Sequence, residues 1–302
     1  AQETKNISSF NPGIVVSDSR LSPLVISKIL GVPSIVILNQ IKLLLSPRIR
    51  EFKVARIFEN LNGEFFGSVW SMAEKLLIPD LPPPYTIAEH NIWNLESAKK
   101  KMHYIGFTTS KWHEDKQAIN RFMDSLHFDK NKPIVFMHIS GPYETRLDLI
   151  STIIDGSKYF RKDVQFIISE GKPNGNIIPR RISSSGWYYE WCPVRDEIFA
   201  LSDLIVLRGG HEAISHAIVH GKPMVTIPIQ NHGEQLGNSE KVEKLKIGVR
   251  LEASKADGYH IAEAIHEILD NESYLENVTK IKTVTDRFDG INNTLNIIRS
   301  FI

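Results

Sequence analysis

Short apolar runs alternate with longer amphipathic segments along most of this chain. Residues 13–16 form an apolar run, and apolar residues then recur at helical spacing over residues 21–30. Gly31 follows at a position where helices often end, and a second apolar run occupies residues 34–38. This succession of strand, helix and strand predicts a parallel β-α-β unit with a right-handed crossover.

The same alternation continues to the end of the chain, and only the polar stretch 108–116, the predicted linker, interrupts it. We therefore expect the α/β class, with two Rossmann-like domains facing across a cleft. The predicted domains are 1–112 and 113–285, and a C-terminal helix, 286–302, could return to the first domain. Strands are predicted at 13–16, 34–38, 75–79, 102–107, 134–139, 164–168, 187–191, 204–207 and 224–227, and the later helices at 117–126, 144–156, 194–201, 210–220, 235–245 and 290–301.

Composition narrows the class of protein. Lys and Arg total 36 against 35 Asp and Glu, so no overall charge attracts nucleic acid. Cys192 is the single cysteine, which excludes an internal disulfide and favours a reducing, cytoplasmic compartment. No apolar run approaches the roughly 20 residues that a membrane-spanning helix needs. The chain begins at Ala1 and reaches a strand almost at once, so we expect the first domain to be incomplete at its N-terminus.

A glycine pair follows the predicted strand 204–207 and leads directly into the predicted helix 210–220. Helix N-termini present unpaired N–H groups and a partial positive charge, and glycines let a phosphate approach them. Arg208, just before Gly209 and Gly210, adds a guanidinium that fits a phosphate. The residues alone leave two interpretations open, a diphosphate site or an ordinary strand-to-helix turn.

The segment from Arg208 to Asn238 resembles the donor-binding segment of GT-B glycosyltransferases. The resemblance is to the UDP-glycosyltransferase superfamily and to the bacterial peptidoglycan N-acetylglucosaminyltransferase, which has a glycosyltransferase family 28 C-terminal domain. That pattern is H-G-G-x-x-S/T-x-x-E-A, G-x-P, a strand ending in Pro, and D-Q-x-x-N. This chain has Arg208-Gly209-Gly210, His216-Ala217, Gly221-Lys222-Pro223, Ile227-Pro228 and Glu234-Gln235-Leu236-Gly237-Asn238.

The resemblance implies a role for each matching residue on the donor phosphates and sugar. Arg208 stands where the family has a phosphate-binding His. The donor phosphates would also contact Gly209, Gly210 and the backbone of His211, together with the small-residue turn Ser140-Gly141 after strand 134–139. The sugar hydroxyls would bind Glu234 and Gln235, and Asn238 would support that loop or the phosphate.

The base and ribose positions match the family only in part. Trp191 and Pro193 match a W-x-P-Q segment that contacts the base, but Val194 stands at the Gln position. The family's ribose-binding Glu is His216 here, and Glu212, one helical turn earlier on the same face, could replace it. The identity of the nucleotide is therefore left open. The aromatic residues of the strand that precedes Trp191 could equally belong to the hydrophobic core.

The catalytic base of the resembled enzymes is a His in a loop upstream of this sequence. Asp18 ends a strand similar to the family strand whose terminal Asp orients that His, and it is the catalytic candidate. The alternative is that Asp18 caps the helix that follows. No metal is expected, because the spacing of His211, His216 and His220 is not H-E-x-x-H.

Residues 41–56 are basic and apolar. They contain Lys42, Arg48, Arg50, Lys53 and Arg56 against a single acid, Glu51. One interpretation is peripheral contact with anionic lipid at the inner face of the membrane, which fits a lipid-linked acceptor. The other is an ordinary amphipathic segment packed on its sheet.

The resemblance implies that the first domain binds the acceptor and the second the nucleotide-sugar donor. It implies a metal-independent, inverting hexosyltransferase that moves a sugar, from a UDP-sugar, to an acceptor hydroxyl. The nucleotide sugar is a substrate, so no cofactor is expected, and nucleic acid is not an expected partner. Two alternatives remain: a sugar-nucleotide epimerase or hydrolase of the same fold, and a non-catalytic donor-binding subunit.

Overall fold

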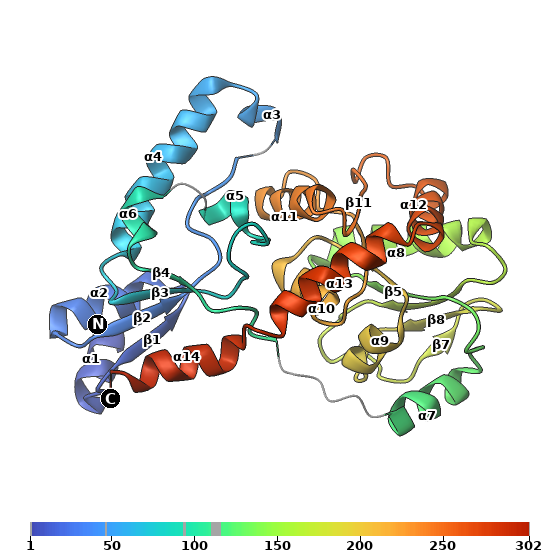
Figure 1. The fold of residues 1–302 in the computed structure, drawn as a ribbon, viewed down its shortest axis with the longest axis horizontal. Helices are drawn as coiled ribbons and strands as arrows, with labels where there is room; N and C mark the ends of the chain where they lie inside the picture. Colours follow the sequence, from blue (N-terminus) through green and yellow to red (C-terminus); the bar gives the residue numbers. More distant parts are fainter. Residues whose placement is uncertain (1, 46, 93–94, 110–115, 302) are drawn as a thin grey trace. The chain divides into compact units, whose positions relative to one another are not determined.

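The computed structural model describes residues 2–45, 47–92, 95–109 and 116–301 (Figure 1). The chain divides into two compact units, one formed by Ala1–Ser110 with Val284–Ile302 and the other by Lys111–Thr283. Most of the predicted linker lies outside the described residues. Each unit is a mainly parallel sheet flanked by helices, which confirms the predicted α/β class.

Unit 1 contains a four-stranded parallel sheet in the order β1-β2-β3-β4. The polar N-terminal stretch is helical, which the sequence analysis did not predict. Helix α14 covers one face of the sheet, where its Ile297 and Ile298 pack against Ile35 and Leu77. The elements are α1 (Gln2–Phe10), β1 (Val15–Asp18), α2 (Leu21–Leu30), β2 (Ser34–Ile37), α3 (Pro47–Arg50), α4 (Lys53–Trp70), β3 (Lys75–Ile78), α5 (Glu89–Ile92), α6 (Glu96–Lys99), β4 (Met102–Tyr104) and α14 (Gly290–Arg299).

Unit 2 contains a seven-stranded sheet in the order β11-β10-β9-β5-β6-β8-β7, parallel except for the pair β7–β8. Predicted strands and helices are present within a few residues, but the aromatic strand ends at Tyr189. The elements are α7 (Lys116–Leu126), β5 (Ile134–His138), α8 (Tyr143–Gly156), η1 (Ser157–Tyr159), β6 (Gln165–Ser169), β7 (Arg180–Arg181), β8 (Gly186–Tyr189), α9 (Arg195–Leu201), β9 (Leu204–Leu207), α10 (His211–Val219), β10 (Met224–Thr226), α11 (Gly233–Lys244), β11 (Gly248–Arg250), α12 (Gly258–Asp270) and α13 (Ser273–Thr285).

The strand order of unit 2 reverses at β5. The chain adds β6 and β8 on one side of β5 and then crosses to add β9, β10 and β11 on the other. Ligands of doubly wound sheets bind at such a switch point, beyond the carboxyl ends of the strands. The loops after β5, β6 and β9 therefore border the expected position of a ligand.

Candidate functional site

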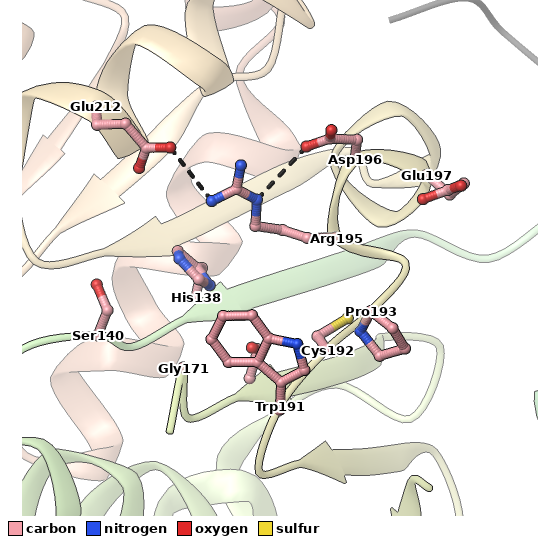
Figure 2. Close-up of a pocket in the computed structure, with 11 residues that line it drawn as sticks. His138, Ser140, Gly171, Trp191, Cys192, Pro193, Arg195, Asp196, Glu197 and Glu212 are labelled. Carbon is pink, nitrogen blue, oxygen red and sulfur yellow. Dashed lines mark hydrogen bonds and ion pairs between the residues drawn. The ribbon is translucent and has the colours of Figure 1, made fainter. Parts of the chain in front are cut away.

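A cavity of about 590 Å³ lies at this switch point (Figure 2). Its wall combines the loops that follow β5, β6 and β8 with the first turns of α9 and α10. It brings together Ser140, Trp191, Pro193 and Glu212, four of the residues predicted from the sequence. Residues that were not predicted complete the lining: His138, Ser169, Gly171, Cys192, Arg195, Asp196 and Glu197.

The glycine turn connects β9 to the start of α10 at this cavity. Gly209 has a φ of 80°, and a Cβ there would lie 2.4 Å from Ser239 Oγ and 2.8 Å from the carbonyl oxygen of Gln235. Asn238 Nδ2 donates to the Gly209 carbonyl at 3.2 Å. The turn therefore needs glycine at position 209, and α11 supports it from behind.

Gly210 differs from its neighbour because it borders open space. It is the N-cap of α10 with an extended backbone, and nothing lies within 4 Å of a Cβ built on it. Gly210 has no side chain with which to cap the first turn of α10. The first N–H groups of this helix and the helix dipole favour an anion at this position.

Glu212 lies in the first turn of α10 within a cluster of charges. Its Oε1 is 3.2 Å from Arg195 Nη1 and 3.1 Å from His216 Nε2. The hydrogen bond from His216 lowers the pKa of Glu212 to about 2, and Arg195 contributes in the same direction. The carboxylate is therefore ionised at neutral pH and aligned by two donors, while His216 itself is buried behind it.

The aromatic residues near the cavity divide into two groups. Trp191 lies in the loop after β8, is 43% exposed and lines the cavity. Tyr188 and Tyr189 are buried in the strand, and Trp187 donates from Nε1 to the Leu126 carbonyl. Trp191 is thus available to a ligand, while its three neighbours serve the packing of the unit.

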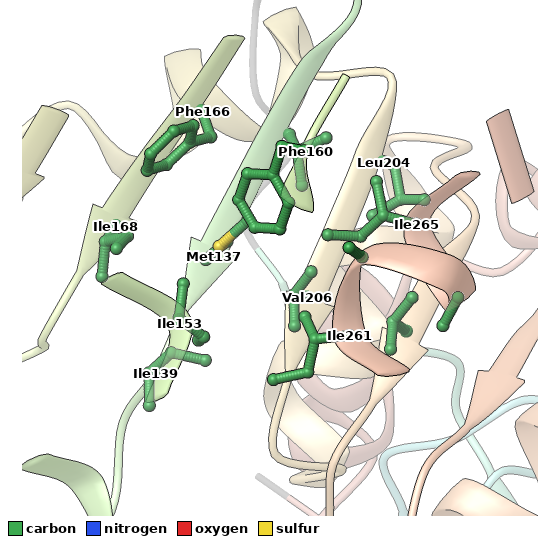
Figure 3. Packing of buried hydrophobic residues seen from close by; sticks show 14 of the residues in the cluster. Met137, Ile139, Ile153, Phe160, Phe166, Ile168, Leu204, Val206, Ile261 and Ile265 are labelled. Atoms are coloured by element: carbon green, nitrogen blue, oxygen red, sulfur yellow. The ribbon is translucent and has the colours of Figure 1, made fainter. Parts of the chain in front are cut away.

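Arg208 points to the opposite face of the sheet. By the alternation of side chains along β9, Arg208 lies on the same side as Leu204 and Val206. These two residues pack against α12 around Ile265 (Figure 3). Arg208 is buried, and its Nη1 donates to the Thr145 carbonyl at 3.0 Å. It lines a second hollow of about 390 Å³. The structure therefore does not bring the Arg208 side chain together with Trp191 and Glu212.

The other residues that were predicted to bind the nucleotide-sugar donor do not line the cavity. Gln235 Oε1 accepts from the Ile229 N–H at 2.9 Å, so it braces the loop before α11. Glu234 is half-buried beside it. The others are His211, buried in the first turn of α10, Gly141, with a φ of 127°, and Val194, the N-cap of α9.

Asp18 lies in unit 1 at the carboxyl end of β1, where its side chain is exposed and accepts from Ser19 Oγ at 3.1 Å. It does not cap the following helix, because the N-cap of α2 is Arg20 and no side chain caps that end. The alternative structural role expected for Asp18 is therefore wrong. Within the described parts of both units, no three His, Cys, Asp or Glu residues are grouped as metal ligands.

Arg195 and His138 are two of the cavity residues that the sequence analysis missed. Arg195 directly follows the Trp191–Val194 segment and begins α9, and this position next to the matched W-x-P motif was the available signal. His138 ends a wholly apolar run and resembles a core residue. Its access to the cavity follows from the strand order, which juxtaposes the ends of β5 and β6.

The two mainly parallel α/β units have the architecture of GT-B glycosyltransferases, as the sequence analysis predicted. The glycotransferase of kitacinnamycin has a crystal structure that aligns with 100% of this chain and 79% of its own, at 17% identity and a TM-score of 0.71. Residues 117–293 match the glycosyltransferase family 28 C-terminal domain, and the chain belongs to this family.

Relatives of known sequence support the same assignment. An uncharacterized glycosyltransferase of Methanosarcina acetivorans is 26% identical over 288 residues, which cover 95% of this chain and 72% of the relative. The ecdysteroid UDP-glucosyltransferase of Lymantria dispar multicapsid nuclear polyhedrosis virus is 22% identical over 171 residues, covering 55% of this chain and 31% of the relative. The protein is thus an enzyme of the glycosyltransferase class.

Proposed function

We propose that this glycosyltransferase uses a UDP-sugar and transfers the sugar to an acceptor hydroxyl with inversion and without a metal ion. The observation that best supports this proposal is the switch-point cavity, which combines an exposed indole, an ionised carboxylate and a helix N-terminus. Its volume of about 590 Å³ suits a small-molecule ligand. A similar relative is named a UDP-glucosyltransferase, which favours UDP.

Each part of the nucleotide has a matching group in the cavity. The base stacks on Trp191, an interaction worth roughly 1–3 kcal/mol per base. The ribose diol donates to the Glu212 carboxylate. The diphosphate accepts from the N–H groups that follow Gly210, and the negative charge that develops on the leaving diphosphate is stabilised there without a metal ion.

The chemical step is a single displacement. The acceptor oxygen attacks the anomeric carbon from the side opposite the diphosphate, a base removes the hydroxyl proton, and UDP leaves. The configuration therefore inverts. Incubating the protein with nucleotide sugars and lipid extracts, and determining the product's anomeric configuration by NMR, tests this proposal. Release of UDP without a glycosylated product would contradict it.

We expect Glu212 to make the enzyme prefer UDP to 2′-deoxy-UDP. Loss of a hydrogen bond to a charged group costs about 1.5–3 kcal/mol, or roughly 10- to 100-fold in affinity. Calorimetry should show this preference in the wild type, and Glu212→Gln should reduce it. Glu197→Gln is the matched control, because it removes another carboxylate from the same cavity. Equal binding of both nucleotides by the wild type would contradict the role of Glu212.

We propose Asp18 as the residue that orients the catalytic base. Asp18→Asn should then lower kcat by at least tenfold and leave the affinity for UDP unchanged, because the donor-binding residues lie in unit 2. Steady-state kinetics and calorimetry measure the two quantities, with Ser19→Ala as the control for the hydrogen bond between these neighbours. Unchanged turnover in Asp18→Asn would remove Asp18 from the mechanism.

Helix α4 carries a row of large apolar residues on its outer face. Its buried face consists of Ala55, Glu59, Gly63, Gly67 and Trp70, and a Cβ at Gly63 or Gly67 would lie 2.7 Å or less from a neighbouring side chain. The outer face is an apolar stripe in which every residue is more than half exposed. The stripe consists of Val54 (76%), Ile57 (58%), Phe58 (54%), Leu61 (66%) and Phe65 (64%).

Only some of the side chains of residues 41–56 are packed against the rest of unit 1. Ile41 is buried, but Leu43, Phe52 and Val54 are exposed. An amphipathic helix with an apolar stripe and basic neighbours binds the interface of an anionic membrane, and Lys53 and Arg56 are exposed beside the stripe.

We therefore propose that the apolar stripe of α4 rests on an anionic bilayer, where a lipid-linked acceptor would be reached. The cytoplasmic leaflet is the anionic one, so the proposal places the protein on that side. The contact is peripheral. Among the described residues, no helix combines the length and the hydrophobicity needed to cross a bilayer.

A further inference from the structure

His138 ends β5 inside the switch-point cavity, and none of the roles above involves it (Figure 2). The side chain is only 8% exposed. Its ring centroid lies 5.7 Å from that of Phe136 and 6.1 Å from that of Phe199. Aromatic packing therefore fixes the imidazole at the cavity wall.

The imidazole is a buried polar group with an unmet hydrogen-bonding capacity. Nδ1 is shut off from solvent and has no hydrogen-bond partner. Burial lowers the pKa of His138 to about 4, and the neighbouring charges of Arg195 and His216 act in the same direction. The ring is therefore neutral at pH 7, with one N–H donor and one bare nitrogen.

The surroundings indicate which nitrogen bears the proton. A buried N–H without an acceptor is rarer in proteins than a buried acceptor without a donor. We therefore assign the bare nitrogen to the enclosed Nδ1 and the hydrogen to Nε2. Beside the ring, the Cβ position at Gly171 lies 3.9 Å from Cε1, and the absence of a side chain at Gly171 leaves this edge of the imidazole uncovered.

Three neighbours of His138 can bind an anionic ligand group, although Asp196 and Glu212, which pair with Arg195, line the same cavity. Ser140, two residues later, lines the same cavity with a hydroxyl, and Arg195 contributes a guanidinium. The first turn of α10 is also at this cavity, where Glu212 lines it. A neutral imidazole among these groups can donate a hydrogen bond to a phosphate oxygen. Because it adds no positive charge, it does not slow the release of the nucleoside diphosphate product.

We propose that His138 donates a hydrogen bond from Nε2 to a phosphate oxygen of the bound nucleoside diphosphate. This inference rests on the proposed donor site and adds to it a binding residue at the end of β5. His138 thus discriminates a nucleoside diphosphate from the bare nucleoside.

Two amide variants distinguish the ring nitrogens. The amide nitrogen of His138→Gln reaches the position of Nε2, whereas that of His138→Asn falls near Nδ1, and His138→Leu has no donor. Calorimetry should show that His138→Gln binds UDP within about threefold of the wild-type affinity. The His138→Asn and His138→Leu variants should each bind UDP about tenfold more weakly than the wild type. Uridine, which lacks the diphosphate, should bind all four proteins equally, and thermal unfolding identifies any variant that is not folded.

The outcomes separate this inference from the proposed function. If the wild type does not bind UDP, the donor site and the role of His138 are both wrong. If the wild type binds UDP and folded Leu, Asn and Gln variants bind it equally, only the role of His138 is wrong. Weakened uridine binding in the Leu variant would place the contact on the nucleoside and also overturn the inference.

Discussion

Gly210→Ala is expected to leave the fold intact and to weaken UDP binding by about 30-fold, or roughly 2 kcal/mol. The backbone of Gly210, with φ −66° and ψ 138°, suits alanine, and the added Cβ meets no atom within 4 Å. The protein alone thus gives no reason for glycine here. A phosphate that approaches the first N–H groups of α10 would collide with the methyl group.

The measurement combines UDP calorimetry with thermal unfolding. Stability should change by less than about 1 kcal/mol, because alanine restricts the unfolded chain but is a slightly poorer N-cap. Equal UDP affinity in Gly210→Ala and the wild type would show that no phosphate lies at this turn.

Gly209→Ala is the matched comparison one residue earlier. Position 209 has a left-handed backbone, which destabilises the fold by about 1–3 kcal/mol when the residue there has a side chain. The Cβ of alanine would also lie only 2.8 Å from the Gln235 carbonyl oxygen. This variant should therefore lose stability as well as UDP affinity. The pair separates a glycine required by the fold from a glycine required by the ligand.

The double variant Phe58→Glu/Leu61→Glu is expected to reduce binding to anionic vesicles by at least 100-fold. Burying each of these side chains in the interface is worth about 1.5–3 kcal/mol, and the new carboxylates are repelled by the lipid. Flotation with phosphatidylserine–phosphatidylcholine vesicles measures the effect. The melting temperature should not fall, because both side chains are exposed.

Asn60→Glu is the control for this experiment. Asn60 is exposed on the same helix but outside the apolar stripe, so its variant adds a charge without removing apolar contact. Its vesicle binding should fall by less than about threefold. If the wild type does not float with the vesicles, or the double variant floats equally well, the membrane proposal is wrong. Concentration-dependent dimers that the double variant abolishes would identify a second copy of the chain as the occupant.

The fold could be predicted because its signals are local. The run from Leu204 to Leu207 is a buried strand, and Gly209 with Gly210 marks the turn into α10. Helix α1 was missed because a polar stretch without a buried residue has no apolar periodicity toward a core. The aromatic strand was predicted two residues too long because Trp191 continues the aromatic run beyond Tyr189, where β8 ends.

The site was less predictable because it depends on direction as well as position. The spacing that aligned Arg208 with a phosphate-binding His gives no information on the face of the sheet. The alternation along β9 does, since Arg208 follows Leu204 and Val206 at intervals of two. Similarly, the periodicity of α4 defines an apolar stripe, whereas Gly63 and Gly67 identify the face that contacts the rest of unit 1.

The position of α14 has a consequence for how the enzyme is made. Ile297, Ile298 and Phe301 cover a sheet face of unit 1, and Asn293 donates to the Ile105 carbonyl. The ribosome delivers these side chains after every strand of both sheets. Until these side chains are available, the sheet of unit 1 therefore has Ile35 and Leu77 uncovered on that face, and exposed apolar surface of this kind makes an incomplete chain prone to aggregation.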